Sequence, residues 1–403
     1  MTVYPAGEPR PDTSNLNLAP GQTIANLVIC RLGEGGALTL ANPAGACDAI
    51  ADVLATSRPE RAQGERIPSW SVSDTTDDAT RRSRLIGVKL RALVGDHLGE
   101  PIAEADGFAP GAALVHAGTA WVYLDDRPAH RLGAALAWAI RHDCYSLAAV
   151  AEAGTGTLAR RAAAPEMPIE VWEARGRLLV PAEPARLPGS DHPPARHETF
   201  RDLIVEGGAV PVVEHGVLTG EVAGLEVCRV VDDDAAGTTR LEVGVGAHDR
   251  EAFQMLHGDI PPVESLARVV AAVARHRQSG ASPHPLNTLG AERLIRWRVE
   301  QEPELVGATV VTPVPPPLPR ENLKDPVPCV ATGLAEDGST IVIVCSSGVD
   351  LDLIPYAIDA RLAVLGEPGI GRLVVAMPSR DRIPLVGEIA HRLRHPPEFV
   401  SVD

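Results

Sequence analysis

Two regions of the chain show the same succession of apolar and polar segments. Residues 84–174 and residues 293–403 each begin with a basic residue and two aliphatic ones, then continue through two strand-like apolar runs. The matching segments are Arg84-Leu85-Ile86 and Arg293-Leu294-Ile295, then 121–125 and 341–345, and finally 169–172 and 399–402. Similarity at a spacing of about two hundred residues favours two related α/β units over a solenoid, whose repeats span roughly 20–50 residues.

Strand-like and helical patterns alternate within each region. In a helix predicted from 129 to 141, Leu132, Leu136 and Ile140 form an apolar stripe. The other elements expected in the first region are a hairpin at 113–124, strands at 147–151 and 169–172, and a helix at 157–164. In the second region, strands are expected at 341–345, 373–377 and 399–402, and helices at 351–364 and 383–394. This β-α-β-α-β order predicts parallel strands with right-handed crossovers.

The region between the two units has a different pattern. Strand-like runs at 220–231 and 240–245 are joined by an acidic turn at 232–237, which predicts an antiparallel hairpin. Helices are expected before it, at 199–206, and after it, at 262–277. The predicted fold class is therefore α/β, with two related β-α-β-α-β units flanking a central α+β region that contains the hairpin.

Composition shifts give the expected domain boundaries. Prolines gather at 181–198, which is typical of a linker, and at 313–328, where they exclude a helix or a central strand. The first predicted segment is an N-terminal arm with a partly ordered α/β segment at 1–83, which includes a strand at 25–30, a helix at 43–56 and a polar loop at 57–83. The segments that follow are the first α/β unit at 84–180, the Pro-rich linker at 181–198, a central helix-hairpin-helix region at 199–292 and the second α/β unit at 293–403.

Charge and cysteine content narrow the possible functions. A net charge of −16 disfavours extensive nonspecific binding to nucleic acid or to an anionic membrane, which carry the same sign. The basic run at 81–84 and the pair Arg160-Arg161 are interpreted as solvated helix faces. No apolar run approaches the roughly 18 residues of a membrane span, and no signal-peptide pattern is present, so we expect a cytoplasmic protein. Its 6 cysteines form no Cys-x-x-Cys pair and are expected to be reduced and structural.

Carboxylates follow several of the predicted strands. Because ligands of α/β sheets bind beyond the carboxyl ends of the strands, these residues are candidate ligand positions. They are Asp125 and Asp126 in the first unit, and Asp350, Asp352 and Asp381 in the second. The same residue types also cap helix N-termini, so a purely structural role is the alternative. Gly154-Thr155-Gly156 is part of a phosphate-loop pattern without its third glycine, and an ordinary tight turn explains it as well.

The central region holds the sharpest acidic cluster. Glu226 and Glu242 lie on the predicted hairpin, and His248 and Asp249 follow it. A Glu-bearing helix followed by acidic strands resembles the metal-binding core of PD-(D/E)XK nucleases. This resemblance covers only residues 198–276 and implies that Glu226 and Glu242 hold a divalent metal, with His248 or Asp249 near the reacting water. The family's defining lysine is missing, and the glutamates can equally form the solvated face of the hairpin.

Residues 241–253 and 348–355 are similar to an uncharacterised conserved protein family of high-GC actinobacteria, a resemblance that implies no activity. Two functions therefore stay open. The first is a metal-dependent hydrolase acting on a phosphodiester or a nucleotide. The second is a noncatalytic interaction or assembly protein, with a protein partner or a second copy of the chain. The hydrolase is the favoured function, and the noncatalytic protein is the alternative. Sequence does not fix the register of Glu226 and Glu242, because a slip of one residue in the hairpin moves one glutamate to the opposite face.

Overall fold

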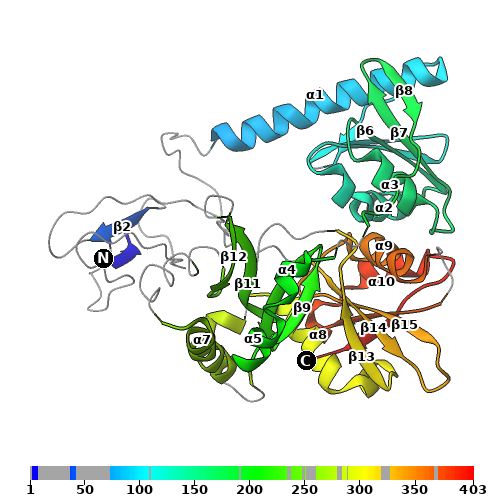
Figure 1. Ribbon diagram of the computed structural model, residues 1–403. Helices are drawn as coiled ribbons and strands as arrows, with labels where there is room; N and C mark the ends of the chain where they lie inside the picture. Colours follow the sequence, from blue (N-terminus) through cyan, green and yellow to red (C-terminus); the bar gives the residue numbers. More distant parts are fainter. Residues whose placement is uncertain are drawn as a thin grey trace. The chain divides into compact units, whose positions relative to one another are not determined.

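The chain forms two compact units, Met1–Pro68 and Ser69–Asp403 (Figure 1). The computed structural model describes residues 2–7, 37–41, 73–108, 110–189, 192–233, 237–246, 250, 260–278, 284–287, 289–318, 327–366 and 371–403. In the first unit, β1 (Thr2–Pro5) pairs antiparallel with β2 (Leu38–Ala41). The strand expected at 25–30 and the helix expected at 43–56 lie outside the described residues.

The first sheet of the larger unit has six strands in sequence order. They are β3 (Asp106–Gly107), β4 (Gly111–His116), β5 (Thr119–Leu124), β6 (Ser146–Ala151), β7 (Ile169–Arg175) and β8 (Leu178–Pro181). Strands β5, β6 and β7 are parallel, as the sequence predicts, and the flanking pairs are antiparallel. The associated helices are α1 (Ser73–Leu98), the short 3₁₀ helix η2 (Pro128–His130), α2 (Leu132–Arg141) and α3 (Thr155–Ala162).

The second sheet has five strands, also in sequence order. They are β13 (Val310–Val314), β14 (Cys329–Leu334), β15 (Thr340–Cys345), β16 (Arg372–Met377) and β17 (Glu398–Ser401). An antiparallel β14–β15 pair is followed by parallel β15–β16 and β16–β17 pairs. The helices of this part are α8 (Ala291–Gln301), η4 (Pro303–Val306), α9 (Leu353–Leu365), η5 (Ser379–Asp381) and α10 (Pro384–His391). The mixed sheets and their crossover helices confirm the α/β class.

The central region is a four-stranded antiparallel sheet rather than a single hairpin. Its strand order is β12 (Thr238–Val243), β11 (Leu225–Asp233), β10 (Val217–Val222) and β9 (Val210–Glu214). The predicted β11–β12 hairpin is present, but the run expected at 220–231 is divided by a turn at Ala223-Gly224, where both φ angles are positive. The helices here are α4 (Ala195–Glu198), α5 (Arg201–Glu206) and α7 (Pro262–Arg277), with η3 at Pro285–Asn287.

Two other boundaries differ from the prediction. Residues 73–83, expected in a polar loop, belong to the 26-residue helix α1, because they contain no Pro to interrupt it. The Pro-rich segment begins inside β13, which is an edge strand and so tolerates Pro313.

No helix in the described part of the chain is long and apolar enough to cross a membrane.

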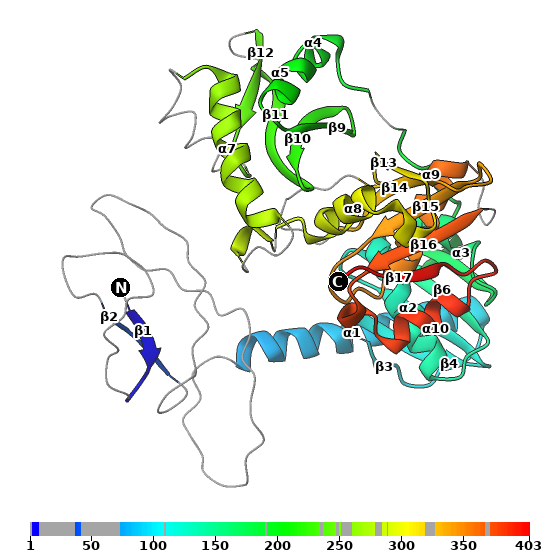
Figure 2. The same ribbon diagram turned by 90° about the horizontal axis from the view of Figure 1, so that it is seen from below.

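Helices α2 and α3 from the first sheet pack against α9 and α10 from the second (Figure 2). Their apolar side chains share one hydrophobic core, which extends from Val122 and Leu147 in the first sheet to Val344 and Val375 in the second. Helix α1 covers the other face of the first sheet, and α8 covers the other face of the second. The two α/β parts are thus joined through their helices, with each sheet between two helical layers.

Candidate functional site

Glu226 and Glu242, the two predicted metal ligands, converge on one arginine. Glu226 is only 2% exposed, and its Oε1 accepts a hydrogen bond of 3.2 Å from Nη1 of Arg250. Nε of Arg250 lies 3.4 Å from Oε2 of Glu242. Arg229 donates two further hydrogen bonds, of 2.9 and 3.0 Å, to Glu226, and Arg240 donates one of 2.8 Å to Glu242. Guanidinium groups therefore lie at hydrogen-bond or ion-pair distance from both carboxylates.

His248 and Asp249, expected near the reacting water, lie outside the described residues. Within the described ranges, no group of three or more His, Cys, Asp or Glu side chains is arranged to hold a metal ion. The metal site and the resemblance to the nuclease core therefore stay predictions. In the described part of the site, the negative charges of Glu226 and Glu242 are paired with arginines in a salt-bridge network.

A second network connects the central sheet to α8. Glu221 of β10 lies directly across from Glu226 of β11, a pairing of like charges that is destabilising unless each has its own counter-ion. Arg293 and Arg296 of α8 both donate hydrogen bonds to the Glu221 carboxylate, and Arg293 also donates one to Glu214. Since all but Glu214 are almost fully buried, the network fixes the position of the central sheet against α8.

A third network joins the two α/β parts and corrects the interpretation of Arg160 and Arg161. These residues are 8% and 0% exposed, not solvated. Arg160 makes two hydrogen bonds, of 2.8 and 3.0 Å, to Asp359 of α9. Arg161 bonds to Asp359 at 2.8 Å and to Asp352 at 2.7 Å. Burial alone would lower the pKa of the Arg161 guanidinium, but the Asp352 and Asp359 carboxylates raise it above its usual value. Burial also raises the pKa of the Asp352 carboxyl, to about 7.

The other candidate carboxylates of the second unit bind backbone amides. Asp352 also accepts a hydrogen bond of 3.0 Å from the amide of Gly133 at the start of α2. Asp350 accepts one of 2.8 Å from the amide of Asp352, and Asp381 accepts one of 2.8 Å from the amide of Gly348. The Asp350 contact is a local one, of a kind that Asp commonly makes, whereas the Asp352 and Asp381 contacts join separate segments of the chain. The carboxyl end of β15 is therefore the junction with α2.

In the first unit, carboxylates at the strand ends hold α1 in place. Asp125 pairs with Arg82 at 2.6 Å. Lys89 donates hydrogen bonds to Glu152 and, at 2.8 Å, to the hydroxyl of Tyr123. Burial raises the pKa of the Tyr123 phenol, so the phenol keeps its proton and does not act as a base near neutral pH.

The remaining candidates of the first unit have simple structural roles. Asp126 lies 3.8 Å from a guanidinium nitrogen of Arg131, as part of an exposed ion pair. Gly154 has a φ of 67° and precedes α3. At Gly156 an added Cβ would lie 2.7 Å from the Cβ of Ala185. The Gly154-Thr155-Gly156 turn therefore allows the linker to approach α3 closely.

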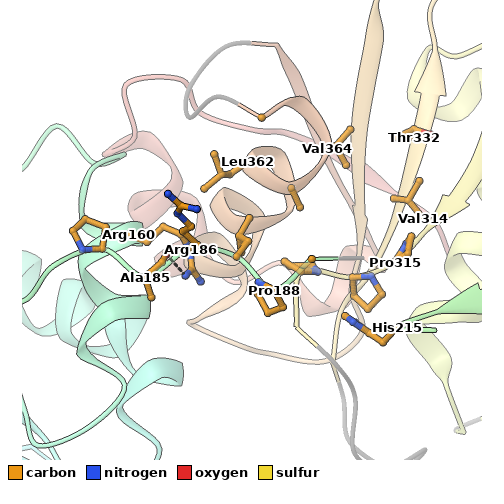
Figure 3. A pocket seen from close by; sticks show the side chains of 17 residues that line it. Arg160, Ala185, Arg186, Pro188, His215, Val314, Pro315, Thr332, Leu362 and Val364 are labelled. Atoms are coloured by element: carbon orange, nitrogen blue, oxygen red, sulfur yellow. Dashed lines mark hydrogen bonds between the residues drawn. The ribbon is translucent and has the colours of Figure 1, made fainter. Parts of the chain in front are cut away.

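A groove of about 810 Å³ is a site that the sequence analysis missed (Figure 3). One wall is the linker segment 184–189, and another is the last turn of α9 with its following glycine, 362–366. The remainder comes from the end of β13 with the prolines 315–317, from Thr332 of β14 and from His215. Its size lies within the roughly 300–1,000 Å³ of small-molecule sites.

The polar groups of this linker groove come from three separate places. Arg160 of α3 and Arg186 of the linker lie toward one end in Figure 3, and His215 lies toward the other. His215 is in the β9–β10 turn with a φ of 46°. Its Nε2 is buried and has no hydrogen-bond partner in the part of the chain that the structure describes. The groove therefore combines an apolar lining with a few nitrogen donors.

No family model matches the sequence, and no curated protein or solved structure matches the chain.

The two proline clusters were the available signal for the groove. They predict segments that form neither helices nor central strands, and these segments supply its walls. Their separation along the chain, from 184–188 to 315–317, hides the fact that they line one groove. The sequence analysis also noted the basic pair Arg160-Arg161, but it interpreted these side chains as solvent-exposed.

Proposed function

We propose that the protein is a noncatalytic interaction or assembly protein of the cytoplasm. The observation that carries this proposal is the pairing of Glu226 and Glu242 with Arg250. A hydrolytic metal site needs carboxylates with free oxygen lone pairs and an open coordination position. Here the oxygen atoms face arginine side chains, which supply positive charge beside the carboxylates without a metal.

The other charged networks support the same proposal. Arg160 and Arg161 bind Asp352 and Asp359 across the two α/β parts, and Arg293 and Arg296 bind Glu221 across the central sheet and α8. Buried ion pairs of this kind add little net stability over apolar packing, but they can select one arrangement of packed elements. We infer that these charges serve to hold one defined arrangement of elements rather than to carry out a reaction.

The proposed location in the cytoplasm rests on cysteine chemistry. Four described cysteines, Cys144, Cys228, Cys329 and Cys345, are free and buried. Cys329 and Cys345 are register partners on β14 and β15 and still carry free thiols. Reduced thiols are typical of proteins in a reducing compartment.

The alternative is the metal-dependent hydrolase, and a metal titration distinguishes the two. Thermal unfolding is measured with and without Mg²⁺, Mn²⁺ or Zn²⁺, for the wild type and for Glu226→Gln with Glu242→Gln. Hydrolysis of bis-p-nitrophenyl phosphate is followed in the same samples. A metal bound only by the folded state at 100 times its Kd would stabilise it by about 2.7 kcal/mol.

For a noncatalytic protein we expect no metal-specific rise of the unfolding midpoint and no hydrolysis above that of the double variant. The proposal is wrong if a metal raises the midpoint of the wild type but not of the double variant, and the wild type hydrolyses the ester. Glu264→Gln is the matched control, because Glu264 pairs with an arginine on the exposed face of α7. Its response to metals should equal that of the wild type.

A further inference from the structure

The linker groove has positive charge and no carboxylate in its lining. Acidic residues outnumber Lys and Arg by 53 to 37 in the whole chain, yet the lining contains two arginines, a histidine and neither Asp nor Glu. Arg160 is neutralised by Asp359. Arg186 is exposed, and it has no salt-bridge partner among the residues that the structure describes. Its guanidinium is therefore available to an anion.

The backbone of Ala185, the residue before Arg186, is held by hydrogen bonds to both its carbonyl and its amide. The carbonyl of Ala185 accepts a hydrogen bond of 2.8 Å from Nη1 of Arg160. The amide of Ala185 donates one of 2.9 Å to the carbonyl of Gly156. Because Arg160 is itself fixed by two bonds to Asp359, the linker has a defined position at this point. A backbone that is already ordered loses less freedom when the adjacent side chain binds a ligand.

Apolar side chains extend from this charged end along the groove. Leu187 and Pro188 of the linker line the groove together with Leu362 and Val364 of α9. Val314 lies farther from Arg186 than Pro188 does (Figure 3). An apolar lining with one available cation at one end is complementary to an apolar molecule with one anionic group. A purely polar anion such as free phosphate would leave most of this lining in contact with water.

We propose that the linker groove binds an organic anion with an apolar body, such as an aryl or alkyl carboxylate or sulfonate. The anionic group pairs with Arg186, and the body lies between the linker and the end of α9. This inference adds a ligand class to the proposed noncatalytic function. It rests on that function in one respect, which is that the groove binds its ligand without a reaction.

Two fluorescent compounds with the same apolar body test the charge requirement. The anionic one is 8-anilinonaphthalene-1-sulfonate, and the neutral one is N-phenyl-1-naphthylamine. Each is titrated into the full chain. Because a hydrogen bond to a charged group contributes about 1.5–3 kcal/mol, Arg186→Gln should weaken binding of the sulfonate at least about tenfold. Binding of the neutral compound should change less than about twofold.

Two further variants locate the site and control for net charge. Ala363 is exposed and lines the groove, so Ala363→Trp should fill it and abolish saturable binding of both compounds. Arg81 is exposed on α1, away from this lining, and Arg81→Gln removes the same charge as Arg186→Gln. The Arg81 variant should bind both compounds as the wild type does. Circular dichroism verifies that each variant is folded.

The inference is overturned if the sulfonate binds equally well to the wild type and to Arg186→Gln, or if Ala363→Trp still binds both compounds. It is also overturned if the folded wild type binds neither. Any of these results, together with absent metal-dependent hydrolysis, would leave the noncatalytic function intact. Metal-dependent hydrolysis lost in the Glu226 and Glu242 double variant would refute the noncatalytic function whatever the two compounds do.

Discussion

Gly133→Ala should destabilise the junction between the two α/β parts. Gly133 is the second residue of α2, and its amide donates a 3.0 Å hydrogen bond to Asp352. An added Cβ would lie 1.8 Å from the carbonyl oxygen of Leu351 and 2.9 Å from the amide nitrogen of Asp352. To restore ordinary contact at 3.4 Å, α2 and the segment before α9 must move apart.

The expected loss in free energy of unfolding is about 2–5 kcal/mol. Overpacking a close contact costs about 1–3 kcal/mol, and a lost hydrogen bond to a buried carboxylate costs about 1.5–3 kcal/mol. Alanine is a better helix former than glycine by about 1 kcal/mol, which offsets part of the loss. The change therefore has the opposite sign to the one that helix propensity alone predicts.

Gly387→Ala in α10 is the matched control. Gly387 is also within a helix, and nothing lies within 4 Å of its added Cβ. Its free energy of unfolding should rise by up to about 1 kcal/mol. Urea unfolding followed by circular dichroism measures both variants. If Gly133→Ala is stabilised as much as Gly387→Ala, then α2 does not contact residues 351–352 in the way described, and the reasoning fails.

Three other predictions concern charge and thiol burial. Arg296→Met removes one of the two arginines that bond to the buried Glu221 carboxylate and should cost about 3–5 kcal/mol in urea unfolding. Arg268→Met, in an exposed pair, should cost less than about 1 kcal/mol, and equal losses would contradict the buried network. Hydrogen bonds, first from Arg196, hold the pKa of Asp232 well below its usual range, so this carboxylate stabilises the fold above about pH 4 and loses that effect as pH falls. Asp232→Asn should therefore lower the thermal midpoint at pH 7, by a margin that shrinks toward pH 3, and a constant margin would count against the pairing. Burial raises the pKa of the Cys228 thiol to about 12, so mass spectrometry after alkylation should find it modified only in unfolded protein, not in native protein.

Much of the secondary structure was predictable because it depends on local hydrophobic periodicity. The apolar stripe at Leu132 and Leu136 predicts α2, and the runs at β6 and β16 predict buried parallel strands. Errors occurred where the local pattern is weak. Residues 73–83 are polar but helical, and a two-residue turn at Ala223-Gly224 divides one apolar run into β10 and β11.

The candidate site was predictable only in its residue types. Sequence analysis identified Glu226 and Glu242 as carboxylates that could meet, and they do converge. It had no means of placing Arg250 between them, because that contact depends on how the chain returns after β12. Likewise, the linker groove is made of segments that are individually ordinary loops.

The sequence by itself determined most of the helices and strands and that the sheets contain parallel pairs, since these follow from side-chain period and loop length. Only the tertiary structure decided what each charged residue does. Arg160 and Asp359 are 199 positions apart in the chain, and Arg161 and Asp352 are 191 apart. An arginine on a helix is the same in sequence whether it faces water or a buried carboxylate; the packing of α3 against α9 selects between the two. Because burying a charged side chain without a partner would be costly, the packing of α3 against α9 and these ion pairs must form together.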